Sequence, residues 1–255
     1  MHDYHVHSSY SDGEILDLMA AAAADIGLDG VGFADHCIVS DRDSPREHRD
    51  RFGFNLDRTY ERRRTAIAAL RTEYDLRVFD AVEMDYHPRD EGAIAEFLAD
   101  AEFDYAIGSV HEIAGHNVHS DYFDGRTATQ QREAVAEYFE KLVALIDSDL
   151  FDVAAHVDIV ERNPALRGYA SPEDYERVAA ALADSDTITE LNAGRVNREY
   201  GEFHPAPAFL ATLAEYDVPV TVGSDAHRPA DLRERHPTLR ERLDDSAVDV
   251  VDLDV

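Results

Sequence analysis

Short apolar stretches rich in β-branched residues recur along the chain, and each is followed by a segment whose apolar positions repeat with helical spacing. Seven stretches predict strands, at residues 4–6, 30–34, 77–83, 105–110, 153–157, 187–191 and 219–223. The intervening segments predict helices at residues 15–26, 56–74, 93–101, 129–146, 172–183, 208–216 and 230–243. This alternation is typical of βα units around a parallel sheet, so the predicted fold class is α/β.

Local signals at the segment ends agree with these elements. Ser171, Pro172 and Glu173 form an N-cap, a first helical residue and a first-turn acid, and Gly27 stops the helix that ends at Ile26. The polar segment 39–53 predicts a long loop, a feature often used as a lid or binding loop in compact domains. No linker or repeat interrupts the pattern, so we expect a single domain over residues 1–255.

Composition narrows the possible classes of protein. The formal charge is -30 and Lys141 is the only lysine, which disfavours nucleic-acid binding through a basic patch. No run of about 18 apolar residues is present, so no membrane association and a cytoplasmic location are expected. Acidic residues spread along the whole chain are typical of cytoplasmic proteins from salt-accumulating halophiles. Oligomeric state cannot be predicted from these features.

Ionisable side chains fall where the predicted strands end. His7, His36, Glu83, His111, His156, Asp225 and His227 all stand in or just after such positions. Because the carboxyl ends of strands in a parallel barrel open on one face, these side chains should converge. Alone, each has a plainer explanation as a core, cap or solvated residue, but the set suits a divalent metal. With Cys37 the only cysteine, thiolate sites of several ligands are excluded, and imidazole and carboxylate must hold the ion.

Several short motifs occur together, from His5-Val6-His7 to Ser224-Asp225-Ala226-His227. The others, in chain order, are Ser11-Asp12, Asp35-His36, Glu83, Ser109-Val110-His111 and His156-Val157-Asp158. Over almost the whole chain this order resembles the polymerase-and-histidinol-phosphatase (PHP) superfamily. The resemblance implies a distorted (β/α)7 TIM-like barrel.

The resemblance also implies three divalent metal ions, which could be Zn, Mn or Fe. It assigns His5, His7, Glu83 and Asp225 to one ion. Glu83 would bridge to a second ion held by His111 and His156. Asp12, His36 and His227 would hold the third.

Within the superfamily, Glu83-Met84-Asp85-Tyr86, Glu190-Leu191-Asn192-Ala193-Gly194 and Glu202-Phe203-His204-Pro205 are similar to the histidinol-phosphatase branch. This similarity implies a phosphomonoesterase of histidine biosynthesis that acts on L-histidinol phosphate. Two features depart from the branch: segment 112–125 is rich in His and Asp, and His204 stands where Tyr is expected.

Clustered divalent ions suit phosphomonoester hydrolysis, because they offset the phosphate charge and activate water as hydroxide. In this reading Glu83 positions a metal-bridging hydroxide, and Asp225 and His227 complete the catalytic set. Arg162 and Arg195 follow predicted strands and would bind the phosphate, with Arg198 as a weaker candidate. Position alone suggests Glu112 as the partner of the substrate ammonium.

Three alternatives remain open at this point. The first is a PHP phosphatase of other specificity, acting on nucleoside monophosphates or nucleotide bisphosphates. The second is an amidohydrolase, which is disfavoured because Lys141 lies within a predicted helix rather than at a strand end. The third is a non-catalytic metal-binding or interaction domain.

Overall fold

Seven parallel strands form one sheet in the computed structural model, which describes residues 1–244 and 248–255. The strands pair in the order β1-β2-β3-β4-β7-β8-β9. Their bounds are β1 His2–Val6, β2 Gly30–Cys37, β3 Arg77–Asp85, β4 Tyr105–Ser109, β7 Val153–Ala154, β8 Ile188–Asn192 and β9 Val220–Gly223. All seven predicted strands are therefore present, in chain order around the sheet.

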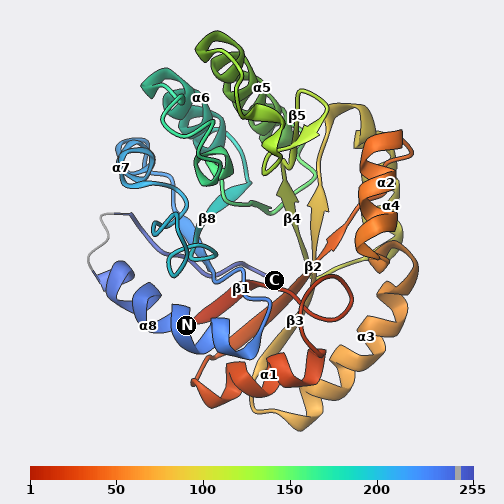
Figure 1. The fold of residues 1–255 in the computed structure, drawn as a ribbon. Helices are drawn as coiled ribbons and strands as arrows, with labels where there is room; N and C mark the ends of the chain where they lie inside the picture. Colours follow the sequence, from red (N-terminus) through yellow and green to blue (C-terminus); the bar gives the residue numbers. More distant parts are fainter. Residues whose placement is uncertain (245–247) are drawn as a thin grey trace.

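The sheet curls until its first and last strands meet. At the seam the Asp225 amide donates to the His5 carbonyl at 2.8 Å, and the His7 amide donates to the Ala226 carbonyl at 2.9 Å. The segment after β9 thus joins β1, and the strands make a nearly closed barrel (Figure 1). The predicted distorted (β/α)7 barrel is confirmed.

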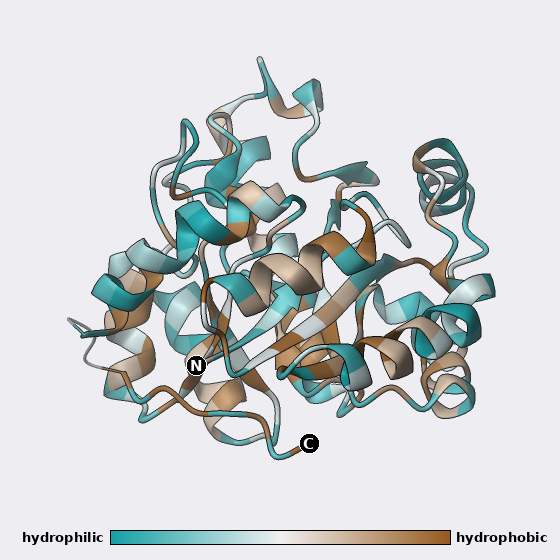
Figure 2. Ribbon diagram, turned by 90° about the horizontal axis from the view of Figure 1, so that it is seen from below, coloured by the Kyte–Doolittle hydropathy of each residue, from teal (hydrophilic) through white to brown (hydrophobic). Residues whose placement is uncertain are grey.

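Helices surround the barrel and bury their apolar sides against it (Figure 2). They are α1 Leu16–Asp25, α3 Leu56–Glu73, α4 Glu91–Ala101, α5 Ala128–Asp147, α6 Pro172–Ala183, α7 Pro207–Glu215 and α8 Pro229–Asp244. Helices α5 and α6 begin with capping boxes at Thr127 and Ser171, which satisfy amides of the first turn. None of the helices in residues 1–244 and 248–255 has the length and apolar character needed to cross a membrane.

The prediction of a loop over residues 39–53 was wrong. Most of this segment is helix α2, Asp43–Phe52, which ends at Gly53 with φ of 72°. None of the α2 residues is buried, so the helix has no apolar stripe to produce the periodic signal by which the other helices were predicted.

Two further departures concern the carboxyl ends of the strands. Strand β7 stops at Ala154, earlier than predicted, because His156 has φ of 27° and cannot continue an extended strand. Segment 112–125 contains the short hairpin of β5 (Glu112–Ile113) and β6 (His116–Asn117), followed by the 3-10 helix η2 (Asp121–Phe123). Both features lie on the face where the ionisable residues were expected to converge.

Candidate metal centre

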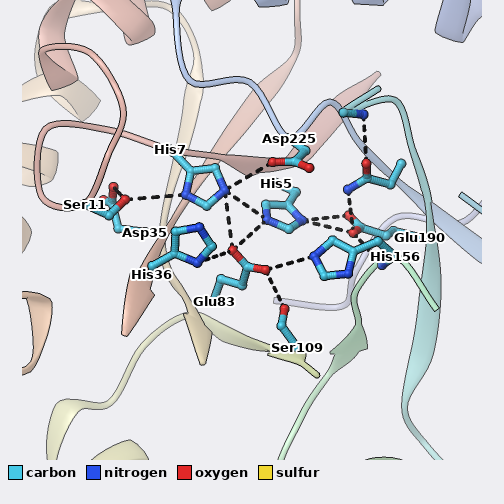
Figure 3. A network of polar contacts seen from close by, with 12 residues as sticks. His5, His7, Ser11, Asp35, His36, Glu83, Ser109, His156, Glu190 and Asp225 are labelled. Carbon is cyan, nitrogen blue, oxygen red and sulfur yellow. Dashed lines mark hydrogen bonds and ion pairs between the residues drawn. The ribbon is translucent and has the colours of Figure 1, made fainter. Parts of the chain in front are cut away.

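The nine side chains expected to bind metal lie together at the carboxyl ends of the strands (Figure 3). They come from β1 to β3 and from the segments after β1, β4, β7 and β9: His5, His7, Asp12, His36, Glu83, His111, His156, Asp225 and His227. Seven of the nine line a cavity of about 830 Å³. His5 and His7 lie beneath its floor with no solvent exposure.

Four donor atoms at the floor form a compact group. His7 Nε2 lies 3.2 Å from His5 Nε2 and 3.5 Å from Asp225 Oδ1. Glu83 Oε2 lies 3.3 Å from His5 Nε2 and 3.5 Å from His7 Nε2. A tetrahedral ion with bonds of about 2.1 Å separates its donors by about 3.4 Å. These four atoms therefore have the spacing of a zinc-like first coordination sphere.

The carboxylate of Glu83 faces histidines on both of its oxygens. Oε2 lies 2.8 Å from His36 Nδ1, whereas Oε1 lies 3.1 Å from His156 Nε2 and 3.7 Å from His111 Nε2. Within the described residues Oε2 is buried without a hydrogen bond of good geometry, although imidazole nitrogens surround it. A carboxylate with this surplus acceptor capacity fits a bridging position between ions.

A further group of donors lies toward the cavity mouth. Donor atoms of His7, Asp12, His36 and His227 all lie within 4.8 Å of one another. The closest pair is His227 Nε2 and Asp12 Oδ1 at 3.3 Å. Asp12, the member with no strand to position it, is thus brought to its expected neighbours. The geometry also places His7 in this group, which the resemblance did not imply.

Outer contacts orient the imidazoles. Both oxygens of Glu190 lie 3.0 Å from His5 Nδ1, and Asp85 pairs with His111 Nδ1. The carbonyl oxygen of Asp225 lies 3.0 Å from His227 Nδ1. Each contact keeps the proton on Nδ1 and leaves Nε2 free to bind an ion. Glu190 and Asp85 were missed as site residues, although both stand near strand ends as Glu83 does.

A buried ion pair holds the loop that carries Asp12. Asp35 accepts from the amide and hydroxyl of Ser8 at 2.6 and 2.7 Å and from the hydroxyl of Ser11 at 2.9 Å. Its charge is balanced by Arg63, whose Nη1 lies 2.7 Å away and whose side chain is fully buried. The loop is therefore fixed from below, and Asp12 is presented to the cavity without contributing to the fixation.

Burial and charge set the protonation of the centre in opposite ways. Burial lowers the pKa of His7 and of His156 to about 4, so both are neutral at pH 7. Burial also opposes charge on Glu83, but His36 and His5 outweigh it and hold its pKa well below the usual value. Neutral imidazole beside an ionised carboxylate is the protonation state that metal binding requires.

Arginines form one wall of the cavity. Arg162 Nη2 lies 3.1 Å from Asp225 Oδ2, so this guanidinium touches the donor groups directly. Arg195 and Arg198 also line the cavity, and neither makes an ion pair with residues 1–244 or 248–255. Burial, with Arg162 nearby, lowers the pKa of Arg195 from its ordinary value. Unpaired guanidinium groups in so acidic a chain are available to an anion.

The structure does not bring Glu112 to the cavity. Its Oε1 lies 2.7 Å from Arg42 Nη1, and Glu112 is not among the lining residues, so its predicted role toward a substrate ammonium is not retained. Its position after His111 was misleading because the chain turns into the β5–β6 hairpin there. Of the two hairpin histidines, His119 lines the cavity, whereas His116 stacks on Tyr122 with ring centroids 3.5 Å apart.

The wall provided by α2 is aromatic. His48, Phe52 and Phe54 line the cavity, and the Phe54 ring stacks on His36 with centroids 5.0 Å apart. Phe52 is 56% exposed, which is unusual for a large apolar side chain. The helix that the sequence did not reveal therefore presents flat apolar surface to the space above the donor groups.

Comparisons with known proteins agree with this arrangement. A family model described as the PHP domain matches residues 3–193. A protein of Deinococcus radiodurans named "Probable histidinol-phosphatase" is 27% identical over 223 residues, which cover 84% of this chain and 80% of that protein. A Lactococcus lactis protein named "Histidinol-phosphatase" is 26% identical over 201 residues, or 74% of this chain and 70% of that protein.

A solved structure has the same fold. The crystal structure of histidinol phosphate phosphatase from Lactococcus lactis, complexed with zinc, L-histidinol and phosphate, superposes with a TM-score of 0.72 and 21% identity. The match covers 94% of this chain and 92% of that one. At this identity the likeness establishes the shared fold.

Proposed function

The chain belongs to the PHP domain family, and from this premise we propose that it is a metal-dependent phosphatase that hydrolyses L-histidinol phosphate to L-histidinol and phosphate. The observation that carries the proposal is the carboxylate of Glu83, whose two oxygens face different imidazoles beside a wall of arginines. Adjacent ions held there would offset the charge of a phosphate dianion and activate water.

The donor groups support three bound ions. The first group is His5, His7 and Asp225, and the second is His7, Asp12, His36 and His227. The third joins Glu83 and His111 with His36, and His156 lies on the same carboxylate oxygen as His111. Imidazole with carboxylate suits zinc, manganese or iron. Zinc is the first choice, because the related Lactococcus lactis structure contains it.

The protein's own residues would bind and orient the ester. Arg162 and Arg195 would hold the phosphate, since planar guanidinium groups pair with two oxygens at once. Asp225 is held between His7 and Arg162, so it links the donor groups to this phosphate site. His227 covers the mouth group, and Arg198, which is exposed, would contribute less than Arg195. Phe52 and Phe54 would contact the imidazole ring of the substrate through their flat faces.

The acidic composition supports a proposal about the setting in which the enzyme works. A charge of -30 keeps a protein hydrated in concentrated salt, where the screening length is only about 3 Å at 1 M. Repulsion between the surface and an anionic ester would then be small. We therefore place the enzyme in a salt-rich cytoplasm, and stability that rises with KCl concentration would test this.

A substrate panel tests the proposed reaction. Phosphate release from L-histidinol phosphate should exceed release from a nucleoside monophosphate, a nucleotide 3′,5′-bisphosphate and p-nitrophenyl phosphate by about 100-fold in kcat/KM. A chelator and the variant Glu83→Gln should both abolish it. If L-histidinol phosphate is no better than the generic ester, the proposed substrate is wrong. If bound metal is present and no ester is hydrolysed, the proposal of a phosphatase is wrong.

Two arginine variants test the proposed phosphate site. Arg195→Ala should lower kcat/KM by about 100-fold, the usual effect of removing one donor to a developing oxyanion. Arg198→Ala should change it less than about threefold, because this exposed side chain keeps its solvation. Equal effects of the two substitutions would contradict the assignment of Arg195 to the phosphate.

A further inference from the structure

The guanidinium of Arg162 is held at three points. Its Nε donates to His204 Nε2 at 2.8 Å, and its Nη2 donates to Asn192 Oδ1 at 3.3 Å and to Asp225 Oδ2 at 3.1 Å. Its Nη1 makes no hydrogen bond within residues 1–244 and 248–255, and Arg162 lines the cavity. Because a guanidinium is planar, fixing Nε and Nη2 fixes the direction of the remaining donors.

His204 can accept the bond from Arg162 in only one tautomer. An arginine Nε has only a proton to offer, so His204 Nε2 must accept, and the imidazole proton must lie on Nδ1. Nδ1 faces Asp158 Oδ1, which receives that proton, while Asp158 Oδ2 accepts the Ala206 amide at 2.7 Å. Burial, and to a smaller degree Arg162, lowers the pKa of His204, in agreement with a neutral ring.

Packing adds to this fixation. The His204 ring is fully buried and stacks on Tyr200 with centroids 4.9 Å apart and planes 8° apart. Asp158 is fully buried as well. None of these three side chains lines the cavity, so they reach it only through Arg162.

We propose that His204, oriented by Asp158, is a positioning residue that fixes the Arg162 guanidinium between Asp225 and the phosphate of the substrate. The proposal deepens the proposed function and rests on Arg162 as a phosphate contact. It gives a reason for the departure at position 204, where the histidinol-phosphatase branch is expected to have Tyr. A histidine with one hydrogen-bonded nitrogen on each side joins Asp158 to Arg162 directly.

Substitutions at position 204 separate positioning from packing. His204→Phe keeps a ring for Tyr200 but cannot accept a hydrogen bond, whereas His204→Gln keeps an acceptor near the position of Nε2. Small displacements of positioning groups commonly cost about 100-fold. We expect His204→Phe to weaken binding of inorganic phosphate to the metal-loaded protein, and to lower kcat/KM, by about 10- to 100-fold. His204→Gln should restore most of both.

A variant with unchanged cavity shape provides a second route. Asp158→Asn would present its amide NH2 to His204 Nδ1, which moves the imidazole proton to Nε2 and sets it against the Arg162 Nε proton. We expect the same loss of phosphate binding as in His204→Phe. If His204→Phe fails to fold, Asp158→Asn still decides the matter.

The decisive measurement is a double-mutant cycle. In an Arg162→Ala background, His204→Phe and Asp158→Asn should have less than about a twofold further effect, because their route to the phosphate is gone. Equal losses in both backgrounds, or wild-type phosphate binding in both single variants, would overturn the proposal. Phosphate binding is read without turnover, so this outcome is separate from failure of the proposed hydrolysis, which the substrate panel detects.

Discussion

Replacing Glu190 by Gln tests the orientation of His5. Glu190 is fully buried, and its Oε1 accepts from the His156 amide at 3.1 Å and the Asn192 side chain at 2.9 Å. A glutamine would keep its oxygen toward these two donors. Its NH2 would then face His5 Nδ1 and require that nitrogen to accept, which moves the proton to Nε2, the atom that faces His7 and Glu83.

The expected cost follows from the bonds involved. A hydrogen bond to a charged group contributes about 1.5–3 kcal/mol and a neutral one about 1 kcal/mol. Losing the charge at His5 alone therefore costs about 1 kcal/mol or more, and the wrong tautomer adds to it. Outer-contact substitutions at metal sites typically cost about 10- to 100-fold in affinity, or about 1.4–2.7 kcal/mol. We expect Glu190→Gln to lie at the upper end of this range.

The assay is a zinc titration against a chelating dye in concentrated KCl, with phosphate release measured in parallel. A matched control is Glu91→Gln, which removes a half-buried carboxylate that accepts from Tyr86 at 2.6 Å and lies outside the cavity. The control should bind metal as the wild type does. Wild-type zinc affinity in Glu190→Gln would refute the argument that Glu190 sets the tautomer of a metal-binding histidine.

Three further outcomes are expected. Arg63→Met leaves Asp35 buried without its cation and should lower the free energy of unfolding, measured by urea in chelator, by about 3–5 kcal/mol; an unchanged midpoint would contradict the role assigned to this ion pair. The pKa values of His7 and His156, lowered by burial to about 4, mean that the unfolded chain binds more protons between about pH 4 and 6.5. Stability of the chelated protein should therefore fall as pH is lowered through that window, and His156→Gln should reduce the slope; a flat profile in the wild type is the adverse result. Phe52→Ala should raise KM for L-histidinol phosphate about 3- to 10-fold, the value of one aromatic contact, and leave KM for a small aliphatic phosphate ester unchanged; equal changes for both esters would exclude ring recognition.

The strands could be predicted because their apolar residues are buried on both sides, which leaves a plain signal in the sequence. The donor groups could be predicted because chain order becomes angular order in a parallel barrel, as with His36 in β2 and Glu83 in β3. Helix α2 could not be predicted from apolar spacing, since it buries none of its residues. It supplies a wall of the cavity all the same.

Side-chain partners were harder to predict than positions. Glu112 follows His111 directly, yet its carboxylate turns to Arg42, a residue distant in sequence whose approach depends on the tertiary fold. Glu190 is the opposite case, since no motif marks it as a partner of His5 until the barrel closes. Local sequence restricts where a side chain starts, and long-range packing decides what it touches.

The seam between the two ends of the barrel has a consequence for folding kinetics. His5 and Asp225 share a backbone hydrogen bond at the point where the barrel closes, and their side chains belong to one donor group. Contacts so distant in sequence form late, because closing the intervening loop costs the most entropy. A partly folded chain would therefore lack this group, and tight metal uptake would report completed folding. Time-resolved zinc binding during refolding should follow the slowest phase, after the helices have formed.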